Sequence, residues 1–228
     1  IERGQRLVAA TDEDERPAEL AVDRLQAVLA NATDRLASIL VTSRGPDAAV
    51  EQFERARTLF AAVPEESMTD ALRLDSAHNL DRLAQFYVDL NRWEESLLLR
   101  VQAVRILETI VEANPYSIAF RNSLANVRQK QSGLLIRLGR TREGLVALES
   151  ELTDREELKR QYGELPLLQQ GLGRNLALYG AGLNQAGQYE RADEQVKRAI
   201  AILEDLTTRF PDNLLFLVEF GYVTDTMA

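Results

Sequence analysis

Residues 186–192 read Ala-Gly-Gln-Tyr-Glu-Arg-Ala, and apolar residues recur at helical spacing on both sides of them. A glycine between two such stretches predicts a turn, because glycine readily adopts the backbone conformation that ends a helix. Over residues 196–210, apolar positions follow one another at intervals of three and four, which is typical of an amphipathic helix. We therefore interpret Gly187 as the joint between two antiparallel helices, Tyr189 as a packed residue at the start of the second, and Ala192 as the small residue that lets them close.

Turns of this kind recur at a fixed distance along the chain. Asn91, Gly139 and Gly187 each begin such a turn, and they are spaced by 48 residues. Pro115 and Pro211 are 96 residues apart, which is two of these periods. Because a fixed internal period is the signature of a repeat architecture, the sequence predicts an array of 48-residue helical hairpins.

Large and small residues alternate at helical spacing within the unit. Small residues stand at Ala84, Gly180, Ala192 and Ala199, where they allow two antiparallel helices to approach closely while bulky residues fill the space beside them. This order of large, small and aromatic residues resembles the tetratricopeptide repeat (TPR), a helix-turn-helix unit of about 34 residues. The resemblance implies an all-α fold, a right-handed solenoid of antiparallel helical hairpins that forms a TPR-like superhelix.

The resemblance to TPR proteins covers nearly the whole chain. We expect residues 1–17 to be a polar segment or the end of a preceding helix, and residues 18–228 to form the TPR-like domain. The units of that domain are expected at 18–66, 67–114, 115–162 and 163–210, with a partial unit at 211–228.

One unit departs most from the pattern. Gln131 and Ser132 stand where a leucine and a small residue are expected, and Glu151 takes the position that Ala199 holds in the last complete unit. We therefore expect shifted helix packing in the unit around Gly139.

The unit is also about 14 residues longer than a TPR unit. Two helical turns take about seven residues, so roughly two extra turns in each helix keep the same face toward the neighbouring helix. Elongated units with Asn114-Pro115 before a helix and Leu138-Gly139-Arg140 at the turn resemble those beside bacterial Ser/Thr protein kinase domains. The resemblance implies the regulatory or sensor region of a larger multidomain bacterial protein. The scarcity of lysine, which supplies three of 27 basic residues, also favours a bacterial origin with a GC-rich coding sequence.

Both ends of the sequence are interpreted as truncated. The chain begins with Ile1 rather than Met, and the turn that should follow Gly187 lies beyond Ala228. We therefore expect a fragment of a longer protein. Its last apolar stripe, which includes Phe216, Phe220 and Tyr222, would be covered by a further helix or by a second copy of the chain in a homodimer.

Composition argues against several classes of function. The net charge is −9 and the basic residues are interleaved with acidic ones, so the concentrated basic face that nucleic acid requires is not expected. The chain has no cysteine and one histidine, His78, which closes off thiol chemistry and most metal or catalytic-triad arrangements. No apolar run reaches the roughly 18 to 20 residues that span a bilayer. We therefore expect a soluble chain, and its side of any membrane is left open.

No group of residues forms a catalytic set. His78 has no nucleophile motif to serve, and residues 171–173, Gly-Leu-Gly, begin like a dinucleotide fingerprint but are better interpreted as the irregular start of a helix. Acidic clusters at 12–15 and 154–157 are interpreted as solvated helix ends rather than metal ligands. We expect a non-catalytic chain without cofactor or metal, with any enzymatic activity residing in an attached domain such as a kinase.

A concave groove is the expected place of function. In stacked hairpins the first helix of each pair lines the concave side, so polar residues about 140° away from its buried stripe should face the groove. These residues are His78, Asp81, Gln85, Asn126, Gln129, Arg174, Asn184 and Gln185. Their amides and charges suit an extended peptide or a helix, which predicts a protein-binding scaffold. The alternative is a structural spacer or homo-oligomerisation scaffold without a groove ligand.

Overall fold

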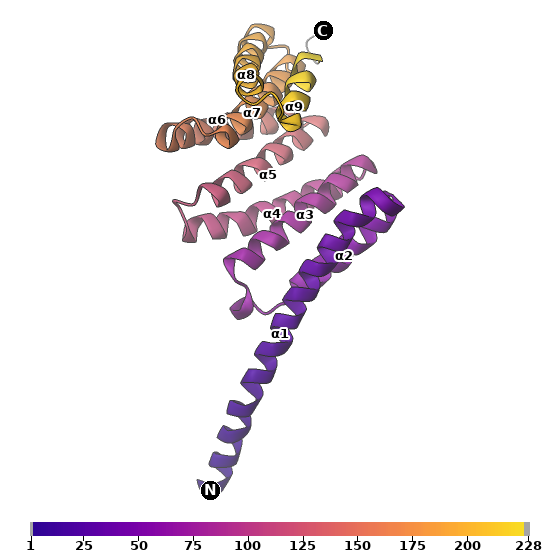
Figure 1. Cartoon of the computed structure of the whole chain (residues 1–228), viewed down its shortest axis with the longest axis vertical. Coiled ribbons are helices and arrows are strands. Elements are labelled where there is room, and N and C mark those ends of the chain that lie inside the picture. Colours follow the sequence, from indigo (N-terminus) through magenta and orange to yellow (C-terminus); the bar gives the residue numbers. More distant parts are fainter. Residues whose placement is uncertain (1, 226–228) are drawn as a thin grey trace. The chain divides into compact units, whose positions relative to one another are not determined.

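The computed structural model describes residues 2–225, with side chains from residue 22 onward apart from those of Arg44 and Asp225. Within this range it contains nine α-helices, one 3-10 helix and no β-strand (Figure 1), so the predicted all-α class is confirmed. The elements are α1 (Glu2–Arg44), α2 (Pro46–Ala61), η1 (Glu65–Ser67), α3 (Asp70–Asp89), α4 (Trp93–Ala113), α5 (Ile118–Arg137), α6 (Thr141–Tyr162), α7 (Pro166–Gln185), α8 (Tyr189–Arg209) and α9 (Leu214–Asp225).

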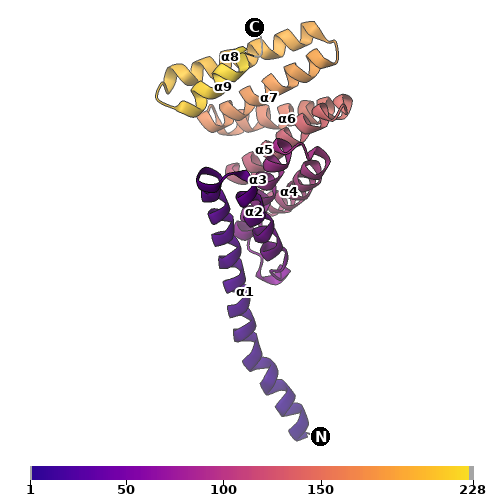
Figure 2. The same ribbon diagram turned by 90° about the vertical axis from the view of Figure 1, so that its right-hand side faces the viewer.

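The chain divides into two compact units, residues 1–106 and 107–228, with the boundary inside α4. In the first unit α1 packs on α2 and α2 packs on α3. In the second unit α5, α6, α7, α8 and α9 pack consecutively, and the first helices of successive pairs also touch, α5 with α7 and α7 with α9. Figure 2 shows the consecutive helices of each unit running back and forth. Antiparallel helical hairpins are therefore confirmed as the building element.

The three predicted joints have the same backbone structure. Asn91, Gly139 and Gly187 all have positive φ, at 58°, 78° and 75°. The amide that follows each of them donates to the carbonyl five residues earlier, as Gln188 N does to Leu183 O at 2.9 Å. This is the hydrogen bond of a Schellman motif, which satisfies a carbonyl at the helix end. The 48-residue period thus repeats in backbone geometry, with Asn91 tolerating the left-handed conformation in place of glycine.

Each of the three hairpins crosses at a pair of small residues. In the first, Ser96 Oγ donates to Ala84 O at 2.7 Å. In the second, a Cβ added to Gly144 would lie 2.8 Å from Ser132 O. These positions are again spaced by 48 residues from one pair to the next, so the shift expected in the unit around Gly139 is not observed: Gly144 provides the close approach there.

The third crossing pair shows why the small residues are needed. A Cβ added to Gly180 would lie 2.5 Å from Val196 Cγ2 and 3.2 Å from Ala192 O, which is tighter than side-chain contacts allow. Ala192 and Ala199 of α8 are both buried against α7. The predicted role of Ala192 is confirmed, whereas Tyr189 is 68% exposed and does not pack at the start of the helix as expected.

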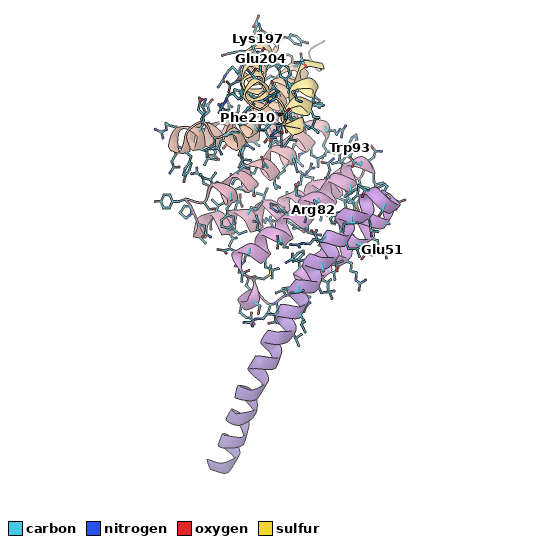
Figure 3. The ribbon with its side chains drawn as sticks, viewed as in Figure 1. Glu51, Arg82, Trp93, Lys197, Glu204 and Phe210 are labelled. Atoms are coloured by element: carbon cyan, nitrogen blue, oxygen red, sulfur yellow. The ribbon has the colours of Figure 1, made fainter. Side chains whose placement is uncertain are left out.

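In the first unit a polar cluster joins α1 to α3. Asn79 Nδ2 donates to Asp34 Oδ1 at 2.9 Å and to Phe53 O at 3.2 Å. Arg82, labelled in Figure 3, extends from α3 and pairs with the same carboxylate of Asp34. The buried carboxylate therefore has two side-chain donors, as a buried charge requires. Residues 2–17, expected as a polar segment or the end of a preceding helix, belong to α1.

Candidate functional site

The second unit contains a large hollow, which we call the α7–α9 groove. Its volume is about 700 Å³. The helices α5, α7, α8 and α9 supply its walls, and most of the lining is apolar. Its residues are Gln129, Lys130, Arg174, Ala177, Leu178, Gly180, Ala181, Asn184, Tyr189, Ala192, Asp193, Val196, Leu203, Val218, Glu219, Tyr222 and Val223.

Small side chains of α7 make the groove deep. Ala177, Gly180 and Ala181 line it on the α7 side, where larger residues would fill the space. The rim carries aromatic and branched residues that project into solvent, with Tyr189 68% and Tyr222 73% exposed. An apolar trough with exposed aromatic edges is suited to taking up apolar side chains of another molecule.

The polar groups of the groove are few and placed at defined points. Arg174 of α7 forms an ion pair with Glu219 of α9, which ties two walls of the groove together. Lys130 and Asp193 add charges of opposite sign to the lining. Both signs of charge are therefore available to orient a ligand inside an otherwise apolar site.

Three of the predicted groove residues meet in this hollow. Gln129, Arg174 and Asn184 come from separate places on α5 and α7 and all line it. Asn184 is exposed, whereas Gln129 is almost completely buried and accepts a hydrogen bond from Arg155 Nη2 at 3.5 Å. Gln129 thus belongs to the floor rather than to a solvated face.

The other predicted groove residues lie elsewhere. His78, Asp81 and Gln85 belong to α3 in the first unit, where Asp81 is buried with its Oδ1 3.6 Å from Arg100 Nε. Gln85 is exposed and accepts from Arg100 Nη2 at 3.1 Å. His78 is half-buried. Asp81 and Gln85 therefore belong to a local polar cluster around the buried Arg100 of α4.

Two predicted residues of the second unit also fall outside the α7–α9 groove. Asn126 of α5 accepts a hydrogen bond from Arg155 Nη2 at 3.0 Å. Gln185 lines a different hollow, formed by α6 and the turn between α7 and α8. Asn126 therefore orients a neighbouring side chain, and Gln185 faces another surface of the domain.

Sequence reasoning did not predict that a charged residue, Arg155, would be buried in the second unit. Arg155 of α6 is 1% exposed and lies between the amides of Asn126 and Gln129 and the backbone of Gly171. A Cβ on Gly171 would overlap its guanidinium. Burial lowers the pKa of Arg155 to about 10 and raises the pKa of Glu151, one turn before it, to about 7. The 48-residue alignment could have predicted this burial, because Arg155 occupies the repeat position at which Leu107 and Leu203 are buried.

The Gly-Leu-Gly stretch is explained by this packing. Residues 171–173 lie well inside α7, so they are not an irregular helix start as expected. Gly171 makes room for Arg155, and a Cβ on Gly173 would lie 3.1 Å from Leu203 Cγ. Both glycines are required by close helix packing rather than by a nucleotide.

The apolar residues of α9 are divided between the core and the groove. Phe216, expected to be exposed for a homodimer, is buried, with its ring 5.8 Å from that of Phe210 in an edge-on contact. Phe220 is half-buried against the same core. Tyr222 and Val218 are exposed and line the α7–α9 groove. The predicted dimer stripe is therefore not one continuous exposed surface.

The described side chains contain no group of three or more His, Asp or Glu residues arranged to hold a metal ion. The acidic residues at 154–157 lie near basic partners, as Glu156 does at 2.7 Å from Arg198 Nη2. The cluster at 12–15 falls among residues whose side chains are not described. Among the described helices none has both the length and the apolar composition of a membrane span.

Comparison with known proteins shows similarity at the level of fold. No protein-family model and no curated protein sequence matches the chain. BtubC (BKLC) from P. vanneervenii is 19% identical with a TM-score of 0.63, over 80% of this chain and 66% of that one. Aspartyl phosphate phosphatase F from Bacillus subtilis is 18% identical with a TM-score of 0.61, over 95% of this chain and 50% of that one.

A third solved structure carries the repeat in its description. The putative kinesin light chain of Podosopora anserina, with nearly identical TPR-like repeats, is 16% identical with a TM-score of 0.52, over 88% of this chain and 87% of that one. The chain thus spans about two thirds and one half of the first two structures. At these identities the similarities show the fold, which is that of TPR-like helical repeats.

Proposed function

We propose that the chain is a non-catalytic TPR-like scaffold that binds a protein partner through the α7–α9 groove. The single observation that supports this proposal most is the groove itself, an apolar hollow of about 700 Å³ built on the first helices of successive hairpins. TPR-like helical repeats present such surfaces to partner proteins, because stacked hairpins expose an extended face on their first helices.

The chemistry of the groove favours a peptide segment with apolar anchors. The walls of Leu178, Val218 and Tyr222 would take up one or two large apolar side chains of the partner. Arg174 and Glu219 form an ion pair in the lining of the groove, so both charges would lie next to a bound peptide. A polar group between the apolar anchors of the peptide would be oriented by this pair. The helical or extended form of the bound segment sets which anchors can be reached together.

A display experiment tests the proposal without knowledge of the partner. Peptides selected from a random library on the wild-type chain should lose at least about tenfold in affinity for Ala181→Trp, since an indole at this lining position would occupy the space of one anchor. Ala181 is exposed and lines the groove, so the substitution does not disturb the core. Ala201→Trp on the exposed face of α8 is the matched control and should bind as wild type does.

Two outcomes decide against groove binding. If selection enriches no peptide, or if enriched peptides bind Ala181→Trp as tightly as wild type, the alternative of a structural spacer or oligomerisation scaffold is favoured. Circular dichroism spectra of both variants should match that of the wild type, which would exclude unfolding as the cause of any lost binding.

We further propose that the scaffold regulates an effector domain of the full-length protein, such as a Ser/Thr kinase. The support is the resemblance of the elongated units, with Asn114-Pro115 and Leu138-Gly139-Arg140, to those beside bacterial kinase domains. In the full-length protein, a selected groove peptide should then change the activity of the effector domain, and Ala181→Trp should abolish that change. An effector whose activity ignores the peptide would leave the chain a docking module only.

A further inference from the structure

Helix α1 presents a row of apolar residues to solvent. The row, which we call the α1 stripe, consists of Val22, Leu25, Leu29, Ala32, Leu36 and Ile39, and all six are exposed. Leu25 is 68% exposed and Ile39 63% exposed. Val28 lies beside the stripe and is exposed as well. A continuous row of this kind is unusual on a surface that faces only water.

The opposite face of α1 is the one that packs against the rest of the first unit. Ala27 and Ala30 contact Ala56, Phe60 and their neighbours in the core of the unit. Asp23 accepts from Ser67 Oγ at 2.7 Å, and Asp34 is held by α3. The usual arrangement of an amphipathic helix is therefore reversed, because small and acidic residues face the domain while the large apolar residues face outward.

The spacing within the α1 stripe is that of a coiled coil. Successive members are 3, 4, 3, 4 and 3 residues apart, which places them at the a and d positions of a heptad. The buried core residues of α8 from Ala192 to Leu206 alternate by four and three residues in the same way, so this spacing indicates a helix face that packs against another helix. The stripe extends for roughly 26 Å at 1.5 Å per residue.

Helix α1 spans 43 residues while its hairpin partner α2 spans 16, and Figures 1 and 2 both show its N-terminal part continuing past α2 and α3. The α1 stripe lies C-terminal to that part, on the segment whose other face contacts α2 and η1. We propose that the α1 stripe pairs with the α1 stripe of a second copy of this chain in a two-stranded parallel coiled coil. The stripe is complementary to itself, since each apolar layer would meet the same layer of the other copy.

The flanking residues are consistent with parallel pairing. Arg35 occupies the g position, and in a parallel coil a g residue faces the following e position of the partner, which is Leu40. The two Arg35 side chains therefore do not face each other, and the stem of each can cover an apolar residue. No pair of like charges opposes the association across residues 22–40.

Sedimentation equilibrium of the whole chain tests the pairing. The wild type should have twice the mass of one chain, and Leu25→Glu should raise the dissociation constant of the dimer by roughly 100-fold or more, because two buried leucines are lost in each dimer. Leu98→Glu is the matched control: Leu98 is a leucine of α4 with 63% exposure, and its substitution should leave the dimer intact. Unchanged circular dichroism of both variants would exclude unfolding as the cause.

Disulfide trapping tests the direction of the two helices. Because the chain has no cysteine, a single Leu36→Cys can form a disulfide only with another copy. In a parallel pair the two copies of residue 36 lie in one layer, whereas an antiparallel pairing of the stripe would place them about 16 Å apart along the axis. Mild oxidation should give a covalent dimer of Leu36→Cys, whereas Ser38→Cys, exposed and outside the stripe, should stay monomeric on a denaturing gel. A monomeric wild type, or a dimer that Leu25→Glu leaves intact, would show that the stripe does not pair with a second copy and would overturn the proposal. A dimer without the Leu36→Cys disulfide would overturn its parallel arrangement.

Discussion

Two neighbouring hairpins of the second unit share one backbone plan but have different interiors. In the α7/α8 hairpin, Ala199 and Leu203 are buried in an apolar core. In the α5/α6 hairpin the same repeat positions carry Glu151 and Arg155, which are also buried. The crossing of small residues is preserved in both, so the fold depends on close approach near the hairpin joint and tolerates a change of chemistry two to three turns further on.

What makes the polar interior tolerable is the set of groups around it. Arg155 Nη2 has amide acceptors on α5, Gly171 of α7 leaves space for the guanidinium, and a carboxyl lies one turn before it, whereas Nε and Nη1 are buried without a hydrogen-bond partner among the described residues. The α7/α8 hairpin has no such set around Leu203, which a Cβ on Gly173 would already approach to 3.1 Å. The difference teaches that the repeat position admits a charge where nearby amides accept from it and a glycine opposite leaves space for it.

Leu203→Arg should have the largest effect. It introduces a charge at a fully buried position with apolar neighbours, and it also removes a core leucine. We expect a loss of at least about 4 kcal/mol in the free energy of unfolding, or failure to fold. Urea denaturation followed by circular dichroism measures it. A loss below about 1 kcal/mol would contradict the view that partners decide where the charge is tolerated.

Arg155→Leu should have a smaller but substantial effect. The substitution restores the residue found in the other hairpins, yet it removes the cation that most lowers the pKa of the buried Glu151. We expect a loss of about 3 kcal/mol, the usual cost of removing one member of a buried polar pair.

The double variant Glu151→Ala with Arg155→Leu separates the two causes. It gives the α5/α6 hairpin the alanine and leucine of the α7/α8 hairpin, so its stability should return to the wild-type value or exceed it by a few kcal/mol. A double variant as unstable as Arg155→Leu would show that Arg155 stabilises the hairpin through contacts other than its charge, and the comparison would have to be revised.

Much of the fold was predictable because it is encoded locally. Turn residues and small residues act through the backbone of their own hairpin, so a 48-residue period in sequence becomes a period in structure. Residues 186–192 contain both a success and a failure of sequence reasoning. Gly187 and Ala192 behave as predicted, whereas Tyr189 does not, because nothing in its own helix determines whether it packs inward.

The candidate site was predictable only in part, because its burial is decided by helices far along the chain. Helical spacing places one stripe of a helix in the core, but the first helix of a hairpin is covered on more than one side. Asp81 and Gln129 are therefore buried although their spacing placed them on the open face. Phe216 is buried for the same reason, by contact with Phe210 across a turn.

The smallest expected effect is a pH dependence that only the polar hairpin should have. Burial raises the pKa of Glu151 from its ordinary value of 4.5 to about 7, so the folded chain keeps a proton that the unfolded chain releases between these values. The stability that Glu151 contributes is fully present below pH 4.5 and is lost as the pH rises through 7. Between pH 4.5 and 7.5 the wild type should therefore lose roughly 2 kcal/mol of unfolding free energy relative to Glu151→Gln, whose side chain stays neutral.

Denaturation midpoints of the two proteins across this range measure the difference, with Glu157→Gln on the exposed side of α6 as the control that should follow wild type. Parallel curves for wild type and Glu151→Gln would show that Glu151 is ionised in the folded chain at pH 5, and that Arg155 compensates its burial in full.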